Sequence, residues 1–230
     1  MSLELNIKSI NNRIAEAAVR SGRTPEDVLL CAVTKYSDID TILQAYNLGL
    51  GVFGENRIQS VMPKMEALPK DIRWHFIGHL QRNKVKFVVG NFELIHSVDS
   101  VRLAKEIDNQ CAKSGVTQDI LLELNLSGEM TKYGIGRDNI RSILDTVLEM
   151  QNLNLLGFMT MAPFVGDDSV IRSVFAGLRE LRNEIAEEYQ LELPHLSMGM
   201  TNDFETAIEE GATIVRIGSA IFLDETEDKG

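Results

Sequence analysis

A lysine stands at the end of an apolar run in the stretch LLCAVTKYS, residues 29–37. If the run is a buried strand, Lys35 lies where the strand leaves the interior, and lost hydration there disfavours its charged ammonium form. A neutral amine is a nucleophile towards carbonyl groups, so Lys35 is a candidate for a covalent Schiff base. The alternative is that Lys35 only tips its strand and extends its charged end into solvent.

A second group of candidates lies in SMGMTNDFETAIEEG and TIVRIGSAIF, within residues 197–222. Ser197 and Thr201 precede a helical pattern, and the later apolar run ends at Gly218 and Ser219. Hydroxyl groups, a glycine that permits close approach and the free N–H groups of a helix start together favour an anion such as phosphate.

A purely structural explanation of this segment stays open. Thr201 would then be the N-cap of the following helix, with Glu205 interacting with the helix dipole. Asp203 and Glu205 would also repel a phosphate unless they point away from it.

Arg216, in the same segment, bears on the chemistry of any pyridine cofactor. A guanidinium keeps its proton, so it donates a hydrogen bond to a ring nitrogen without protonating it, and the ring stays a weaker electron sink. That disfavours transaminase-like chemistry and fits racemisation or storage. The alternative is that Arg216 forms an ion pair with one of the many acidic residues.

Two further patterns are weaker. GLGVFG (49–54) fits the dinucleotide-binding glycine motif, but its glycines enter a short strand instead of joining a strand to a helix. His75 and His79 are four residues apart, yet WHFIG alternates as a strand and the sequence offers no evident third ligand, so we expect no metal site.

Short apolar runs alternate with helical patterns along the chain. After a first helix from Leu3 to Arg20, about eight strand–helix units follow, and near-continuous apolar runs are typical of parallel strands covered on both faces. This predicts an α/β protein, a single (β/α)8 TIM barrel with an extra N-terminal helix. The barrel is expected to be one domain over residues 1–230, with the N-terminal helix in 1–22 and an acidic tail in 224–230. The predicted strands are 28–33, 51–53, 73–78, 93–98, 118–126, 153–159, 195–199 and 212–218.

In such barrels the chemistry gathers at the carboxyl ends of the strands, and phosphate often binds between the loops after strands 7 and 8. The second group of candidates falls in those two loops. The residues expected at the strand ends are Lys35, Glu55, Asn56, His75, His79, Ser97, Asn125, Met159, Thr160, Ser197, Arg216, Gly218 and Ser219.

Composition limits the classes of partner and compartment. A formal charge of −11 over 230 residues opposes a phosphate-backbone footprint, so we expect no nucleic-acid partner. Two isolated cysteines, Cys31 and Cys111, indicate a reducing compartment. The N-terminal residues lack a secretory apolar region, and no run approaches the about 20 apolar residues of a membrane span, so a cytoplasmic protein is expected.

Several motifs together resemble a known family. AVTK, FGENRIQ, WHFIGHLQRNK, NLSGEMTKYGI, GFMTMAP, LSMGMTNDFETAI and VRIGSAIF occur in this order, over roughly residues 10–222. They are similar to the YggS/PROSC family of pyridoxal-5′-phosphate-binding proteins, which is related to the N-terminal barrel of alanine racemase. In the loop after Lys35 this chain has AVTKYSD where the family commonly has AVSKTKP, and MGMT and RIGS keep a hydroxyl where the family has MGMS and RIGT.

The resemblance implies a barrel that carries pyridoxal 5′-phosphate as a Schiff base on Lys35. It places Asn56 near the ring hydroxyl of the cofactor and Arg216 at the pyridine nitrogen, and it leaves His75 and Lys132 without an assigned role. The residues that match the phosphate-holding segments are Ser197, Thr201, Gly218 and Ser219, and Met198 is expected beside the ring.

The resemblance also implies a protein of vitamin B6 homeostasis without robust turnover. After Ile221 too few residues remain for the second domain that alanine racemase uses. The alternatives are a weak pyridoxal-phosphate-dependent amino-acid racemase or lyase, and a cofactor-free Schiff-base lyase of the aldolase type. We expect a monomer that passes its small-molecule cofactor to pyridoxal-phosphate-dependent apo-enzymes.

Overall fold

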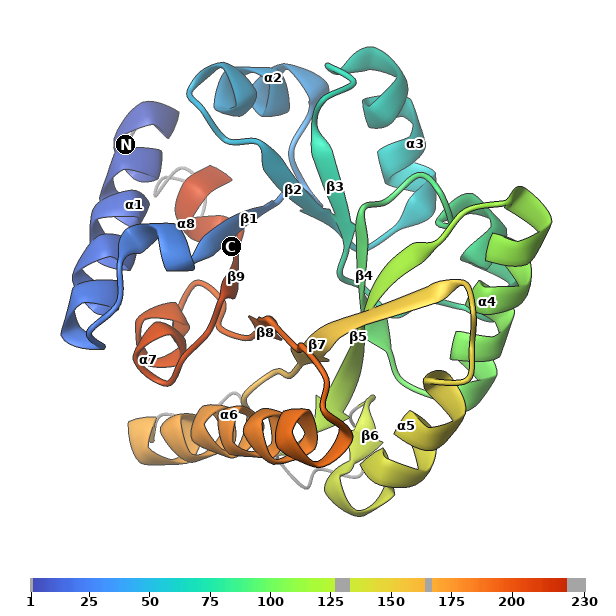
Figure 1. Ribbon diagram of the computed structural model, residues 1–230. Coiled ribbons are helices and arrows are strands. Elements are labelled where there is room, and N and C mark those ends of the chain that lie inside the picture. Colours follow the sequence, from blue (N-terminus) through green and yellow to red (C-terminus); the bar gives the residue numbers. More distant parts are fainter. Residues whose placement is uncertain (1, 127–132, 164–166, 223–230) are drawn as a thin grey trace.

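The computed structural model describes residues 2–126, 133–163 and 167–222. In these residues a closed barrel of parallel strands is surrounded by helices (Figure 1). The strand order is β4-β3-β2-β1-β9-β8-β7-β5, and pairing of β4 with β5 closes the ring. The eight barrel strands are β1 (Leu29–Val33), β2 (Val52–Glu55), β3 (Arg73–Phe76), β4 (Leu94–Val98), β5 (Gln118–Asn125), β7 (Leu153–Met159), β8 (His195–Ser197) and β9 (Ile214–Ile217). The predicted (β/α)8 barrel is confirmed.

Helices connect successive strands around the outside of the barrel (Figure 1). Between β3 and β4, where a strand–helix unit was expected, the connection is a 3-10 segment, η2 (Arg82–Phe87). The α-helices are α1 (Leu3–Arg20), α2 (Ile39–Asn47), α3 (Ile58–Ala67), α4 (Val101–Ser114), α5 (Ile140–Val147), α6 (Asp168–Tyr189), α7 (Phe204–Glu209) and α8 (Ser219–Phe222), and the other 3-10 turns are η1 (Pro25–Asp27) and η3 (Arg137–Asn139).

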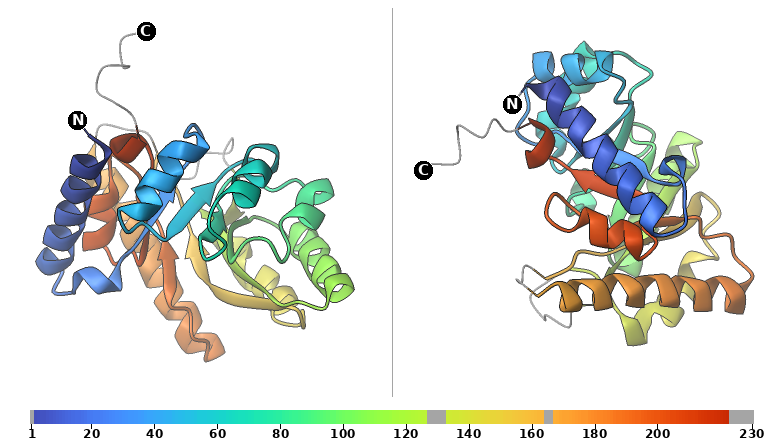
Figure 2. Two further views of the ribbon diagram at one scale, coloured as in Figure 1. Left: turned by 90° about the horizontal axis from the view of Figure 1, so that it is seen from above. Right: turned by 90° about the vertical axis from the view of Figure 1, so that its left-hand side faces the viewer.

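The extra N-terminal helix is present as α1. It begins after Ser2, whose side chain accepts a hydrogen bond from the Leu5 N–H, and it buries the stripe Ile7, Ile10 and Ile14. Figure 2 shows α1 along the outside of the barrel, beside α7 and α8. The helix thus packs on the two helices that precede and follow β9 in the chain.

Two apolar clusters hold the barrel together. The larger lies between the strands and the surrounding helices. The smaller fills the lumen and contains Cys31, Val52, Leu94, Leu121, Met159 and Ile214. Because side chains alternate between the two sides of a strand, polar residues two positions from these also face the lumen.

One strand was not predicted. Ile135–Gly136 form β6, which pairs in parallel with Leu124 and Asn125 at the end of β5. A two-residue strand carries no periodicity that sequence analysis can detect. Within the described ranges, no helix has the length and apolarity needed to cross a membrane.

Candidate functional site

A cavity of about 370 Å³ opens at the carboxyl ends of the barrel strands. Six of the predicted site residues line it: Lys35, Asn56, Thr201, Arg216, Gly218 and Ser219. Its remaining wall is formed by Val33, Tyr36, Ser37, Ile77, Met161, Ala162, Pro163, Met200, Asn202, Asp203 and Phe222. The wall therefore combines a largely apolar surface with an amine at one position and hydroxyl groups at another.

Lys35 is exposed to solvent at the rim of this cavity. Its Nζ lies 4.8 Å from the centroid of the Tyr36 ring. The predicted loss of hydration is therefore wrong for this structure, because Lys35 stands two residues beyond the end of β1 at Val33 and outside the closed lumen. The amine is nevertheless part of the cavity wall and is accessible to a ligand.

The backbone that presents Lys35 is held by a buried ion pair. Lys64 Nζ lies 2.6 Å from Glu55 Oε1 and donates a hydrogen bond of 2.7 Å to the carbonyl oxygen of Thr34. The Thr34 hydroxyl donates to the same Glu55 oxygen, at 2.7 Å. The residue directly before Lys35 is thus fixed by both its carbonyl and its side chain. Sequence analysis placed Glu55 at a strand end but did not identify its partner Lys64.

Hydroxyl groups of two loops meet on another part of the cavity wall. Ser219 Oγ donates to Thr201 Oγ1 at 3.0 Å, which joins the loop after β9 to the loop after β8. Among the described residues, the backbone N–H groups of Asn202 and Gly218 donate no hydrogen bond. Hydroxyl groups and free N–H groups are the donors from which phosphate sites are built. This wall can bind an anion.

The loop after β8 depends on Gly199. Its φ of +91° lies in the left-handed region, and a Cβ added there would come within 2.6 Å of Ala207 Cβ and 2.9 Å of Phe204 Cα. Only glycine tolerates both the conformation and the contact with α7. The turn brings Met200 and Thr201 to the cavity.

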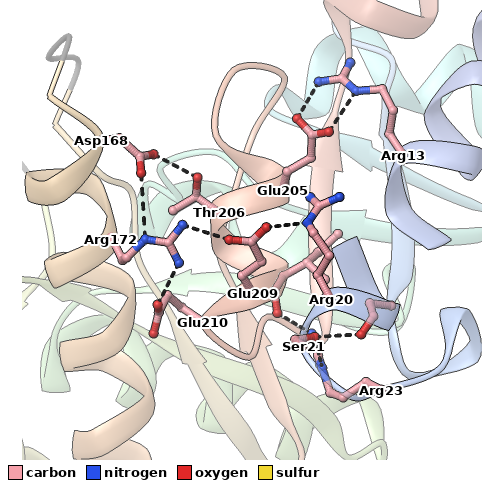
Figure 3. Close-up of polar contacts among 12 residues, drawn as sticks. Arg13, Arg20, Ser21, Arg23, Asp168, Arg172, Glu205, Thr206, Glu209 and Glu210 are labelled. Atoms are coloured by element: carbon pink, nitrogen blue, oxygen red, sulfur yellow. Dashed lines mark hydrogen bonds and ion pairs between the residues drawn. The ribbon is translucent and has the colours of Figure 1, made fainter. Parts of the chain in front are cut away.

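The acidic side chains of α7 point towards arginines of the neighbouring helices α1 and α6 (Figure 3). Glu205 accepts hydrogen bonds of 3.2 and 2.8 Å from Arg13 of α1. Glu209 binds Arg20 and Arg172, each at 2.8 Å. Glu205 therefore does not oppose an anion in the cavity.

Asp203 stays at the cavity wall and caps its own turn. One of its oxygens accepts a hydrogen bond from the Met200 N–H, and burial raises the pKa of its carboxyl. Helix α7 begins at Phe204 with Asp203 as its N-cap residue, so the alternative that Thr201 is the N-cap is wrong. The Thr201 hydroxyl instead accepts from Ser219.

Arg216 lies under the cavity floor with only 4% of its surface exposed. Its Nη1 donates to Ser197 Oγ at 2.5 Å, and its Nη2 donates to the Thr160 carbonyl at 3.1 Å. Within the described ranges it forms no ion pair, so the alternative of a strand-end ion pair is wrong. Burial lowers the pKa of the guanidinium, and the nearby Glu123 carboxylate opposes this shift.

Ser197 and Met198 do not line the cavity. Ser197 is fully buried in the lumen, where its Oγ is 2.8 Å from His96 Nδ1. Met198 is fully buried on the helix side of the sheet. A contact of either residue with a cofactor stays a prediction from the resemblance.

The two histidines of WHFIGH have different neighbours. His75 lies in the lumen and is 3.0 Å from His96 Nε2 through its Nδ1. His79 lies outside the lumen, where its ring stacks on Tyr133 and its Nδ1 is 3.4 Å from Asp99. No cluster of three or more metal-ligating side chains occurs in the described part of the chain. Lys132 lies outside the described residues.

The fold and the cavity define a class: a parallel eight-stranded barrel with a lysine, a buried arginine and a hydroxyl-lined wall at its mouth. The family model described as alanine racemase, N-terminal domain, matches residues 5–226. A pyridoxal phosphate homeostasis protein from Aquifex aeolicus is 46% identical over 217 residues, which cover 94% of this chain and 95% of the relative. The chain belongs to this family of pyridoxal phosphate homeostasis proteins.

Two solved structures support the assignment. An unknown protein from Bifidobacterium adolescentis has a TM-score of 0.91 at 37% identity, covering 96% of this chain and 94% of the other. The structure of PipY from Synechococcus elongatus with pyridoxal phosphate bound has a TM-score of 0.81 at 34% identity, covering 91% of this chain and 99% of the other. The family predicted from the motifs is confirmed.

Proposed function

We propose that this protein binds pyridoxal 5′-phosphate in the cavity, attaches it to Lys35 as a Schiff base, and holds it for intracellular vitamin B6 homeostasis without robust turnover. The observation that carries the proposal is the cavity itself, which presents an accessible amine, a buried guanidinium and an anion-binding wall together. The cofactor found in the PipY structure and the printed name of the Aquifex relative support the same ligand.

The residues of the cavity fit this ligand. Asn56 Oδ1 is buried and has no hydrogen-bond partner among the described residues, so it can accept from a ligand. A Cβ on Gly218 would lie 3.1 Å from the Val33 carbonyl oxygen, so glycine keeps this wall close to β1. The hydroxyl groups of Thr201 and Ser219 supply the phosphate end.

Each residue then has a defined task. Lys35 would hold the cofactor through its Nζ, since a primary amine is the group that can condense with an aldehyde. Arg216 has two of its N–H groups engaged by Ser197 and Thr160, and its remaining donors are available to the ring nitrogen. The cofactor supplies electron-withdrawing chemistry, which an arginine partner keeps weak because the guanidinium does not give up its proton.

The titratable residues of the cavity wall favour holding over turnover. In the part of the chain that the structure describes they are Lys35, Tyr36, Asp203 and Arg216. Tyr36 lies on the side of Lys35, with its ring 4.8 Å from Nζ, and Asp203 is engaged by its own turn. Racemisation requires a base on each face of the substrate, so Tyr36 beside the amine and Asp203 engaged by its own turn support holding over turnover.

Three finer points belong to the same proposal. We expect the protein to act in the cytoplasm, as a monomer, and to release the cofactor to pyridoxal-phosphate-dependent apo-enzymes. Deuterium incorporation at the Cα of L- or D-alanine, measured with the loaded protein in heavy water, separates holding from turnover. Exchange at a catalytic rate would favour the alternative, a weak racemase or lyase.

Borohydride reduction followed by tryptic mass spectrometry tests the attachment. Lys35 is the sole internal cleavage site between Arg23 and Arg57, so a reduced pyridoxyl group on it blocks cleavage and yields the intact peptide of residues 24–57. Lys35→Ala is expected to lose the label and to retain part of the affinity, because the anion-binding wall is separate from the amine. Lys8→Ala, at an exposed lysine of α1, is the matched control. A label on another lysine would refute Lys35.

A further inference from the structure

A line of buried polar side chains crosses the barrel lumen from Arg216. Arg216 Nη1 is 2.5 Å from Ser197 Oγ, Ser197 Oγ is 2.8 Å from His96 Nδ1, and His96 Nε2 is 3.0 Å from His75 Nδ1. The four residues are between 0% and 4% exposed. They come from β9, β8, β4 and β3, and because β8 and β4 are not neighbours in the sheet, the line spans the lumen.

The direction of these hydrogen bonds follows from the donors available. A guanidinium only donates, so Ser197 Oγ accepts from Arg216 and its own hydrogen is free to donate to His96 Nδ1. His96 Nδ1 is then unprotonated, and His96 Nε2–H donates to His75 Nδ1. The remaining proton is on His75 Nε2, a buried atom that has no partner among the described residues.

The reverse direction is less favourable. If His96 Nδ1–H donated to Ser197, the Ser197 hydroxyl hydrogen would have no acceptor within the described ranges, and His75 Nε2 would be an unpaired acceptor. Each buried polar group without a partner carries a desolvation penalty. The direction from Arg216 to His75 leaves one such group, whereas the reverse leaves two.

We propose that Ser197 and His96 are positioning residues that fix the Arg216 guanidinium beneath the cavity, with His96 and His75 both held as neutral Nε2–H tautomers. The part that concerns the cofactor rests on the proposed function, in which the remaining Arg216 donors meet the ring nitrogen. The tautomers of the two histidines do not depend on it.

The charges around the line agree with neutral histidines. Burial is the largest cause that lowers the pKa of His96 well below its usual value, and the nearby Arg216 guanidinium adds to this shift. Burial also lowers the pKa of His75 to about 4. Both rings are therefore uncharged at neutral pH, and the positive charge of the line stays on Arg216. The charged and titratable groups facing the line are Cys31, Glu123 and Asp203 near Arg216, and Arg73, Glu93 and His195 near His75.

Nuclear magnetic resonance of protein labelled with ring-¹⁵N histidine tests the tautomers directly. The chain has four histidines, and single substitutions assign the signals of His75 and His96. We expect both rings as Nε2–H tautomers, without protonation from about pH 8 to about pH 5.5. An Nδ1–H tautomer or an imidazolium at His96 would overturn the proposal, whether or not the protein binds pyridoxal phosphate.

Ser197→Ala tests the positioning role. It should shift the His96 Nδ1 resonance, weaken the affinity for pyridoxal 5′-phosphate roughly five- to tenfold, and move the visible absorption maximum of the bound cofactor. The matched control is Ser97→Ala on β4, which removes a hydroxyl that is equally buried and has no hydrogen-bond partner within the described ranges. We expect it to leave the resonance, the affinity and the absorption maximum unchanged.

The resonance experiment and the binding experiment test the hydrogen-bond line and the proposed function separately. If wild-type protein fails to bind pyridoxal phosphate, the proposed function fails, and the tautomers still decide the hydrogen-bond line. If wild-type protein binds the cofactor and Ser197→Ala matches it in affinity and absorption maximum, the positioning role is refuted and the proposed function stands. A Ser197→Ala variant that loses only thermal stability gives the same refutation.

Discussion

Removing the positive charge of Lys64 should destabilise the protein more than breaking an exposed ion pair would. Lys64 and Glu55 are 2.6 Å apart, and their side chains are 9% and 0% exposed. Lys64→Met keeps the length and apolar stem of the side chain but leaves a buried carboxylate without its cation. Breaking a buried pair from one side typically costs about 3–5 kcal/mol. For a chain of this size that corresponds to a fall in Tm of roughly 6–20 °C.

Equilibrium unfolding in urea measures this loss. Trp74 is the sole tryptophan and is 6% exposed, so its fluorescence reports on opening of the barrel. The matched control is Arg141→Met, which removes a cation from an exposed pair with Glu188 at 2.8 Å and should leave the midpoint unchanged within error. The double variant Glu55→Gln with Lys64→Met should recover most of the loss, since a neutral amide leaves no charge unpaired.

The outcome discriminates between charge and packing. A loss below about 1 kcal/mol for Lys64→Met would place the pair among surface interactions and refute the reasoning. Equal losses in the single and double variants would show that the packing of the Lys64 stem, and not the unpaired carboxylate, carries the effect. Strong non-additivity is the expected signature of the ion pair.

Two further predictions concern the loop after β8 and the lumen. Gly199→Ala should lower the free energy of unfolding by roughly 2–5 kcal/mol, because of left-handed strain and the 2.6 Å approach to Ala207. The control is Gly177→Ala within α6, where the added Cβ meets nothing within 4 Å and should stabilise the protein by roughly 0.5–1 kcal/mol. Urea unfolding measures both. Burial raises the pKa of Glu123 from 4.5 to about 7, so the folded state prefers the protonated carboxyl and stability falls as pH rises through that interval. Glu123→Gln should be more stable than wild type by up to about 3 kcal/mol at pH 8 and equal to it near pH 4, and an unchanged difference between the two pH values would contradict the assignment.

Most of the barrel could be predicted because each strand leaves a strong signal. Apolar runs such as residues 29–33 and 153–159 are bounded by polar chain, and closing such runs into a parallel barrel collects their carboxyl ends in one place. Lys35, Thr201 and Ser219 each stand within four residues of a strand end, so their meeting at one cavity follows from the fold class.

The lumen could not be predicted in the same way. Sequence analysis placed Ser197 at the mouth because it ends its strand, but the alternation of side chains turns it inward towards His96. The alternation in ELIHSV puts His96 on the same side of the strand as Leu94, which faces the lumen. This alternation could have predicted that His96 lies in the lumen. The hydration of Lys35 was misjudged because the position of a side chain two residues past a strand depends on loop geometry.

Arg216 links the stability of the barrel to its ligand. Among the described residues the buried Arg216 guanidinium donates to one hydroxyl and one carbonyl, and burying its charge costs folding free energy that burying an apolar residue would not. A ligand that brings an acceptor into the cavity removes part of that cost and binds only the folded state, so it raises the free energy of unfolding in addition to its own contacts. The free energy of unfolding of the ligand-free protein is therefore lowered by Arg216. We expect the folded population to rise with the concentration of the ligand.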